Sequence, residues 1–150
     1  MYHAIVRRNV EKLFQALGRG DLDYAVAGMA PHFEHIFPGE HTLGGVRHTR
    51  PGIRAWLERL LRVLPGLRFE IKHMAVSGTP WNTTVVVEWR DYATLADGTQ
   101  YVNDGAHAIR IRWGKVVVLH AYLDTQVMVD ALQTMTKAGV AEASAPKIED

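Results

Sequence analysis

The spacing of apolar residues changes near Leu67, and this change limits what the chain can fold into. Before that residue, apolar side chains recur every three to four positions, and after it they alternate with polar ones. The first spacing is typical of amphipathic helices and the second of strands with one buried face. A helical half followed by a strand-rich half predicts an α+β domain, in which helices cover one face of a curved sheet.

The first half of the chain contains three helical stripes and one short alternating segment. Asp21 can cap the second helix and Pro31 ends it, while Pro51 suits the first turn of the third helix. The two consecutive glycines Gly44-Gly45 predict a turn. The expected ranges are helices over about 6–17, 21–30 and 51–64, and a strand over about 32–37.

The second half predicts four strands, at about 68–77, 83–95, 100–113 and 115–124. The pairs Asp97-Gly98 and Gly114-Lys115 mark tight hairpin turns, so the sheet should be largely antiparallel. A last helix begins near Asp124. The segment 138–150, rich in Ala, Glu and Lys, is predicted to be a loosely ordered tail, so that a single domain spans 1–137.

Composition limits the partners and the environment of the chain. Its 150 residues, 47% of them hydrophobic, suit one domain with one core. The 17 Lys and Arg against 16 Asp and Glu argue against a nucleic-acid binder driven by net charge, and the absence of cysteine excludes disulfides and cysteine–zinc sites. No apolar stretch approaches the length of a membrane span and no signal peptide is evident, so we expect a cytoplasmic protein with neither a membrane nor a nucleic-acid partner.

Alternation along the strands predicts which polar side chains face the helices. On the strand 83–95 the inward set includes Trp89 and Asp91, and on the strand 100–113 it includes Asn103 and His107. Tyr101 belongs to the same set and should lie nearer the rim. A curved sheet around helices leaves a pocket at its open end, and such pockets are common sites for small molecules.

The last strand, 115–124, carries apolar residues on both faces. One set contains His120, Tyr122 and Asp124, and the other contains Leu119 and Leu123. A strand that is apolar on both faces indicates that the outer face of the sheet is also covered. We therefore expect a homodimer that forms through the sheet.

Several segments of the chain resemble the SnoaL-like polyketide cyclases. The residues that carry the resemblance are Phe37-Pro38-Gly39-Glu40-His41-Thr42-Leu43-Gly44-Gly45, the Pro51-Gly52 helix start, Trp89, Asp97-Gly98, Gly114-Lys115 and Tyr122-Leu123-Asp124-Thr125. The resemblance covers about residues 5–135. It implies the cone-shaped α+β barrel of nuclear transport factor two and ketosteroid isomerase, a superfamily that contains cyclases, isomerases, dehydratases, epoxide hydrolases and non-catalytic binders.

The resemblance also implies a chemistry. In the cyclases an Asp on the last strand is the acid or base of an intramolecular aldol closure, assisted by a His on the neighbouring strand. Asp124 would be that Asp and His107 the candidate His. Asp124 also stands directly before the last helix, where Asp is a favoured cap, so both roles stay open.

The sequence thus predicts a small-molecule enzyme with cofactor-free acid–base chemistry, either aldol-type cyclisation or isomerisation, on an apolar, carbonyl-bearing substrate. The alternatives are a non-catalytic ligand-binding or dimerisation module of the same fold, and an isomerase or dehydratase. The catalytic candidates are Asp124, His107 and His120. The candidates for substrate binding are Trp89, Tyr122, Asn103, His35, Trp56, Asp91, Tyr101 and Phe37. The acid–base chemistry requires neither a metal nor an organic cofactor, and no metal-ligand spacing is present.

Overall fold

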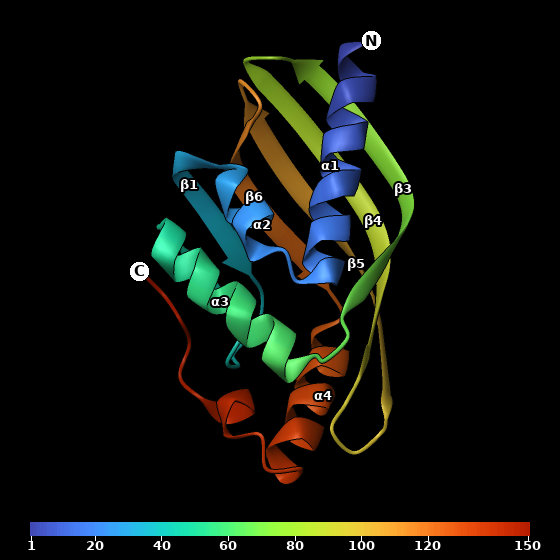
Figure 1. The fold of residues 1–150 in the computed structure, drawn as a ribbon, viewed down its shortest axis with the longest axis vertical. Helices are drawn as coiled ribbons and strands as arrows, with labels where there is room; N and C mark the ends of the chain where they lie inside the picture. The colour runs from blue at the N-terminus through green and yellow to red at the C-terminus, as the bar shows by residue number, and fades with distance from the viewer.

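A computed structural model describes residues 1–150, and Figure 1 shows its fold. The helices are α1 (Tyr2–Arg19), α2 (Leu22–Ala27), α3 (Arg50–Val63), α4 (Thr125–Lys137) and the 3₁₀ turn η1 (Ala141–Ser144). The strands are β1 (Met29–Phe37), β2 (Gly45–Arg47), β3 (Arg68–Thr79), β4 (Asn82–Thr94), β5 (Gln100–Arg112) and β6 (Lys115–Leu123).

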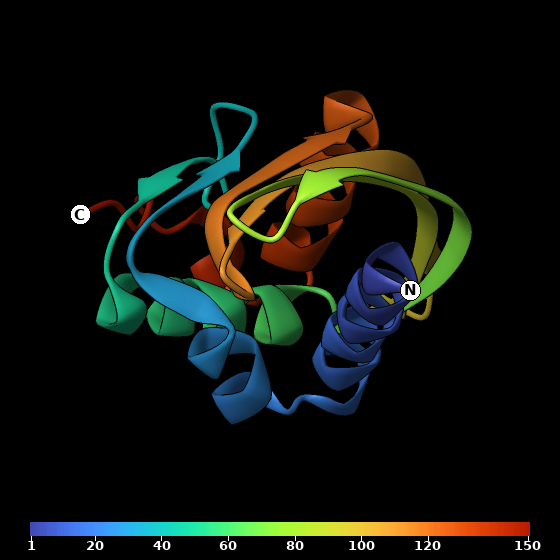
Figure 2. The ribbon, with the colours of Figure 1, turned by 90° about the horizontal axis from the view of Figure 1, so that it is seen from above.

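The six strands form one sheet in the order β2-β1-β6-β5-β4-β3. Every neighbouring pair is antiparallel except β1 and β6, which are parallel. The sheet curves strongly without closing, and α1, α2 and α3 lie on its concave side (Figure 2). This arrangement confirms the α+β prediction of a curved sheet wrapped around N-terminal helices.

Local signals in the sequence explain where the helices begin and end. The Thr49 hydroxyl accepts a hydrogen bond from the Gly52 amide at the start of α3, and the Asp21 carboxylate does the same for the Tyr24 amide in α2. Gly20 ends α1 in the left-handed conformation at φ 74°, which glycine adopts without strain. The buried stripes of α1 and α3 then pack against the inward face of the sheet.

One local prediction was wrong and another was right in part. Pro31 does not end α2, which already ends at Ala27 with Gly28 as its cap, and instead lies inside β1. The pairing of β1 with β6 shifts between Met29 and Glu34, and proline is tolerated in a strand at such an irregularity. The turn predicted at Gly44-Gly45 is confirmed at Gly44, whose amide donates to the His41 oxygen at 2.9 Å, whereas Gly45 already begins β2 and pairs with Phe37.

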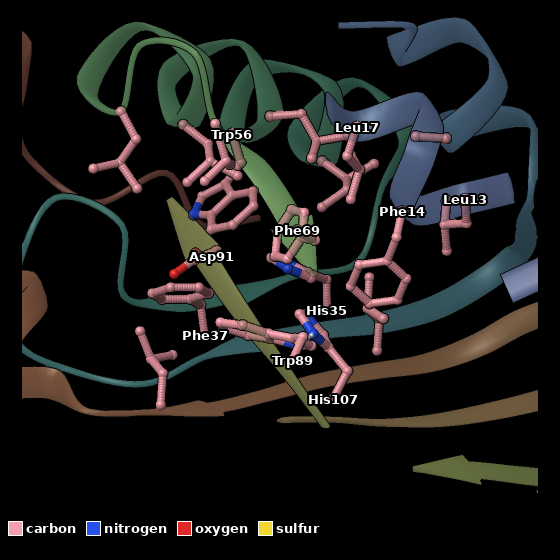
Figure 3. A pocket seen from close by; sticks show the side chains of 18 of the residues that line it. Leu13, Phe14, Leu17, His35, Phe37, Trp56, Phe69, Trp89, Asp91 and His107 are labelled. Atoms are coloured by element: carbon pink, nitrogen blue, oxygen red, sulfur yellow. Dashed lines mark hydrogen bonds between the residues drawn. The ribbon is translucent and has the colours of Figure 1, made fainter. Parts of the chain in front are cut away.

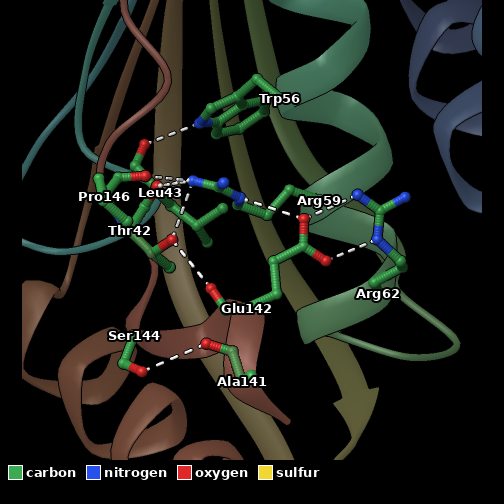
Figure 4. A network of polar contacts seen from close by, with 9 residues as sticks. All are labelled: Thr42, Leu43, Trp56, Arg59, Arg62, Ala141, Glu142, Ser144 and Pro146. Carbon is green, nitrogen blue, oxygen red and sulfur yellow. Dashed lines mark hydrogen bonds and ion pairs between the residues drawn. The ribbon is translucent and has the colours of Figure 1, made fainter.

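Residues 138–150, predicted as a loosely ordered tail, make specific contacts with the domain. Glu142 on η1 forms ion pairs with Arg59 and Arg62 of α3, at 3.2 and 2.6 Å (Figure 4). The side chain of Asp150 accepts hydrogen bonds from the backbone amides of His48 and Thr49. The tail therefore lies along α3, from Arg62 near its end to Thr49 before its start. The Glu149 carboxylate also accepts a hydrogen bond from the Val46 amide on the edge strand β2.

None of the helices has the length and apolar character needed to cross a lipid bilayer.

Candidate functional site

An apolar cavity lies between the concave face of the sheet and the helices (Figure 3). Its lining of 20 residues, 17 of them hydrophobic, comes from all four α-helices and from every strand except β2. The space between the side chains is about 650 Å³ when the open mouth is included, and the centre of a water molecule can reach only about 40 Å³ of it. The cavity is therefore narrow, and it suits a slim ligand or one that displaces apolar side chains.

Only three polar side chains line this cavity: His35, Asp91 and His107. They come from β1, β4 and β5. Asp91 and His107 lie on opposite sides of Trp89 (Figure 3). The cross-strand pair of Trp89 with Gly105 stands between the pair that contains Asp91 and the pair that contains His107. A ligand in the cavity would meet an apolar wall with polar groups at separate points, which is the usual composition of a small-molecule site.

Asp91 is the one carboxylate in the cavity lining. Its side chain is 4% exposed, and its Oδ1 atom is buried without a hydrogen-bond partner. Burial, with a smaller contribution from the negative charge of Asp104, raises the pKa of Asp91 to about 7. Asp91 can therefore both accept and release a proton near neutral pH.

Directly across the sheet from Asp91 stands Asn103. Its amide nitrogen donates to the Tyr101 hydroxyl and to the backbone oxygen of Asp124, both at 3.0 Å. Its Oδ1 atom, like Oδ1 of Asp91, is buried without a partner. Asp91 and Asn103 thus each bury an acceptor that has no donor, on residues that pair across two neighbouring strands. A proton on Asp91 would provide a donor at this place.

His107 is held in one tautomer by Trp89. The indole Nε1–H donates to Nδ1 of His107 at 2.8 Å, so the proton of the neutral ring must be on Nε2. Burial lowers the pKa of His107 to about 4, which keeps the ring neutral at physiological pH. Gly105 makes room for the indole, because a Cβ atom there would lie 2.6 Å from the Trp89 ring.

His35 is held in the same tautomer by a different donor. Nε of Arg47 donates to Nδ1 of His35 at 2.9 Å, and burial, followed by the positive charge of Arg47, lowers the pKa of His35 well below its ordinary value. Nε2 of neither His35 nor His107 has a protein partner, and neither is among the fully buried unpaired atoms. Both rings line the cavity, and the Nε2–H group of each is free to donate a hydrogen bond.

Arg47 is a residue that sequence reasoning missed. Its side chain is 0% exposed, although burying an arginine is costly unless its donors are satisfied. It donates to the backbone oxygens of Gly44, Gly45 and Ile148, and its guanidinium lies 5.1 Å from the centre of the Trp56 ring. Burial lowers the pKa of Arg47 to about 10. Its partners come from β1, β2, α3 and the tail, so no local pattern could reveal it.

The cavity brings together six of the predicted site residues: His35, Phe37, Trp56, Trp89, Asp91 and His107. Tyr101 and Asn103 are buried on the same face of the sheet but do not line the cavity. Burial raises the pKa of Tyr101 above its ordinary value.

The other three predicted residues lie elsewhere. Asp124 is exposed and caps α4, where its carboxylate accepts hydrogen bonds from the Gln126 and Val127 amides at 3.0 and 3.3 Å. Its helix-cap role is thus observed, whereas its carboxylate is outside the cavity lining. His120 and Tyr122 stack on each other at 4.2 Å on the outer face of the sheet, and Tyr122 is 54% exposed.

A shift in pairing explains the placement of His120 and Tyr122. Arg110 pairs with Val118 and Ile111 pairs with Val116, so β6 contains one extra residue at this point. A bulge of this kind exchanges the two faces of the strand beyond it. Val116 and Leu119 therefore both face inward, although simple alternation places them on opposite sides.

No group of three or more His, Asp or Glu side chains converges in an arrangement that could hold a metal ion. The site instead offers a carboxylate that titrates near neutral pH and two neutral N–H donors in apolar surroundings. Such a set can remove a proton from carbon and stabilise the negative charge that develops on a carbonyl oxygen.

Comparison with known proteins places this geometry in context. The family model of the SnoaL-like domain matches residues 10–119 of the chain. No curated protein matches it at a significant level.

Three solved structures illustrate the shared fold. A nuclear-transport-factor-two-like protein of unknown function from Burkholderia pseudomallei superposes with a TM-score of 0.74 at 22% identity, covering 83% of this chain and 95% of that one. TerC, co-crystallised with polyporic acid, gives 0.71 at 23% identity, with 84% and 96% covered. A Jannaschia protein described as a SnoaL-like polyketide cyclase gives 0.66 at 19% identity, with 83% and 88% covered. Identities this low establish the fold alone.

Proposed function

Because this chain belongs to the SnoaL-like domain family, we propose that it is a small-molecule enzyme that performs cofactor-free acid–base chemistry on an apolar, carbonyl-bearing substrate, with Asp91 as the acid and base. The observation that carries this proposal is the position of Asp91, the one carboxylate in an otherwise apolar cavity. The family identifies no reaction, since its fold supports several activities and binders.

The proposed reaction begins with a proton on a carbon next to a carbonyl group. Ionised Asp91 takes that proton, and the carbonyl oxygen becomes an enolate oxygen. An Nε2–H group of His107 or His35 donates a hydrogen bond to this oxygen. Because both rings are neutral and held in place, they stabilise the charge without reorganising.

The proton on Asp91 then completes one of two reactions. Its return to a different carbon isomerises the substrate. Its transfer to a second carbonyl oxygen, when the enolate carbon attacks that carbonyl, closes a ring by aldol addition. Each outcome restores ionised Asp91, and neither needs an oxidant or reductant.

The properties of the cavity and one structural neighbour support a small, mostly apolar substrate. The lining provides aromatic walls from Phe14, Phe37, Trp56 and Trp89, against which flat apolar groups pack well. TerC, which has the same fold, was co-crystallised with polyporic acid, which supports a small-molecule ligand for a cavity of this kind.

A base-catalysed elimination can test the proposal before the substrate is identified. The probe 5-nitrobenzisoxazole loses a proton from carbon, its N–O bond breaks, and a coloured phenolate forms. We expect the wild type to accelerate this reaction as Asp91 ionises, with an apparent pKa of about 7. Asp91→Asn should lose about 10²-fold or more of the rate.

Asp124→Asn is the matched control, because it replaces an acidic side chain that caps a helix outside the cavity. If Asp124→Asn abolishes the rate and Asp91→Asn does not, the acid–base assignment is wrong. If the wild type binds steroid enones or hydroxylated aromatics in a thermal-shift screen but exchanges none of their α-protons with deuterated water, the cavity belongs to a binding module.

A further inference from the structure

Three segments that are far apart in the sequence meet at one end of the molecule, near the N-terminus at the top of Figure 1. The Tyr2 hydroxyl bonds to that of Thr83 at 2.5 Å, and Nε2 of His3 lies 2.8 Å from the Gly78 oxygen. The Trp113 amide donates to the Pro80 oxygen at 2.7 Å. We call the residues 2–8, 78–82 and 110–115 the tip surface.

Two tryptophans on the tip surface are exposed to solvent. Trp81 is 57% exposed and Trp113 is 74% exposed, and their ring centres are 6.1 Å apart. Ile5 on α1 is 52% exposed as well. Large apolar side chains gathered at one end contribute little to the core, so their contact is expected with something outside this chain.

The backbone of Trp113 gives a second, independent indication. Trp113 has φ 50°, and it is the one residue other than glycine with a positive φ. At this position in a two-residue hairpin turn, Asn, Asp or Gly is favoured, because a bulky side chain is strained there. Trp113 therefore has a strained backbone, and its exposed ring does not pack in the core of the domain. This combination points to a function for the ring.

The charge of this end of the molecule is of one sign. The tip surface contains five of the 17 Lys and Arg residues and none of the 16 Asp and Glu residues. All five are exposed and form no ion pair: Arg7, Arg8, Arg110, Arg112 and Lys115. Arg7 and Lys115 also donate to the backbone oxygens of Met74 and Ala27. The net charge of +1 for the whole chain conceals this concentration.

We propose that the tip surface docks on an anionic lipid membrane. Tryptophan prefers the boundary between hydrocarbon and headgroups, and Lys and Arg are attracted to anionic headgroups. A second copy of the chain is a poorer partner, because two basic surfaces would repel each other. Single-stranded nucleic acid is also poorer, because its bases stack in basic grooves, whereas Trp81 and Trp113 stand on the tips of two hairpins.

This docking concerns the surface of a bilayer and needs no spanning helix. The proposal therefore differs from the sequence-based expectation of no membrane partner, which rested on the absence of an apolar span. The proposal does not depend on the chemistry of the cavity.

Sedimentation with lipid vesicles tests the proposal on the full chain. Vesicles of phosphatidylcholine alone are compared with vesicles in which a third of the lipid is phosphatidylserine. We expect binding to the anionic vesicles, weakened by salt, with a blue shift of tryptophan fluorescence. Arg112→Gln should weaken binding about fivefold, as expected for one basic residue near an anionic surface.

Lys137→Gln is the matched control for charge, because Lys137 is exposed at the end of α4. Trp113→Asn should weaken binding and reduce the blue shift to the part that Trp81 contributes, while the protein stays folded, since Asn suits a positive φ. The proposal is overturned if the wild type sediments equally with both vesicles or with neither, or if Lys137→Gln weakens binding as much as Arg112→Gln. It is also overturned if the tip surface binds a single-stranded oligonucleotide instead of vesicles, or if Trp113→Asn dissociates a dimer without lipid.

Discussion

Replacing Asp91 with Asn should stabilise the folded chain, and by more at pH 8 than at pH 5. The pKa of Asp91 is about 7 in the folded protein, against 3.8 for the unperturbed side chain. Between these values the folded state binds more protons than the unfolded state, so the contribution of Asp91 to stability falls as pH rises. Asn cannot ionise, and the variant therefore loses this dependence.

The two pKa values give the size of the effect. Compared with a side chain that cannot ionise, Asp91 lowers the free energy of unfolding by about 1.7 kcal/mol at pH 5 and by about 4.3 kcal/mol at pH 8, because it ionises more readily in the unfolded state. The stability difference between Asp91→Asn and the wild type should therefore grow by about 2.6 kcal/mol across this range. The buried histidines contribute in the opposite sense, because the lowered pKa of His107 makes the fold less stable at low pH. They contribute equally to both proteins and cancel in the difference.

Urea unfolding at several pH values, followed by circular dichroism, measures this difference. Asp130→Asn is a suitable control, because it makes the same substitution at an exposed acidic side chain on α4, outside the cavity lining. A stability difference that stays constant from pH 5 to pH 8 would refute the reasoning. Asp91 would then titrate as an ordinary carboxyl group, and its proposed role as a base near neutral pH would lose its physical support.

Three further predictions follow from the geometry. Asp124→Ala should lower the free energy of unfolding by about 1 kcal/mol through loss of the helix cap, whereas Asp124→Asn should nearly preserve it in the same urea assay, since Asn also caps helices; equal losses in the two variants would contradict a capping role. Gly105→Ala should cost about 1–3 kcal/mol, because the new Cβ atom would lie 2.6 Å from both the Trp89 ring and the Tyr122 carbonyl oxygen. The displaced indole should change the fluorescence of the variant, and an unchanged spectrum and stability would show that the space between Gly105 and the Trp89 ring can hold a methyl group. Finally, we expect a homodimer through the outer face of the sheet, where Val86 and Tyr122 are 44% and 54% exposed, and Val86→Lys should convert it to a monomer in sedimentation velocity; a wild-type monomer at micromolar concentration would exclude the dimer.

The site was predictable where it depends on regular strands. Asp91 and His107 were placed on the inward face from alternation alone, and both line the cavity. The same reasoning could not separate the two faces of β6, because a one-residue bulge near Val117 exchanges them. The preference for Asp124 came from a family resemblance, and the structure shows its carboxylate bonded to the first amides of α4.

By itself, the sequence determined the order of the helices and of all strands except β2, the hairpin turns and the inward face of β4 and β5. These features depend on interactions between neighbours along the chain, which have fixed periods and recognisable turn residues. Only the tertiary structure decided that Arg47 would be buried beside His35, that Trp89 would fix the tautomer of His107, and that Asp91 would be the carboxylate within the cavity. The physical reason is that burial and hydrogen-bond partners arise from segments that are distant in the sequence, and those surroundings determine the pKa and the protonation of each group.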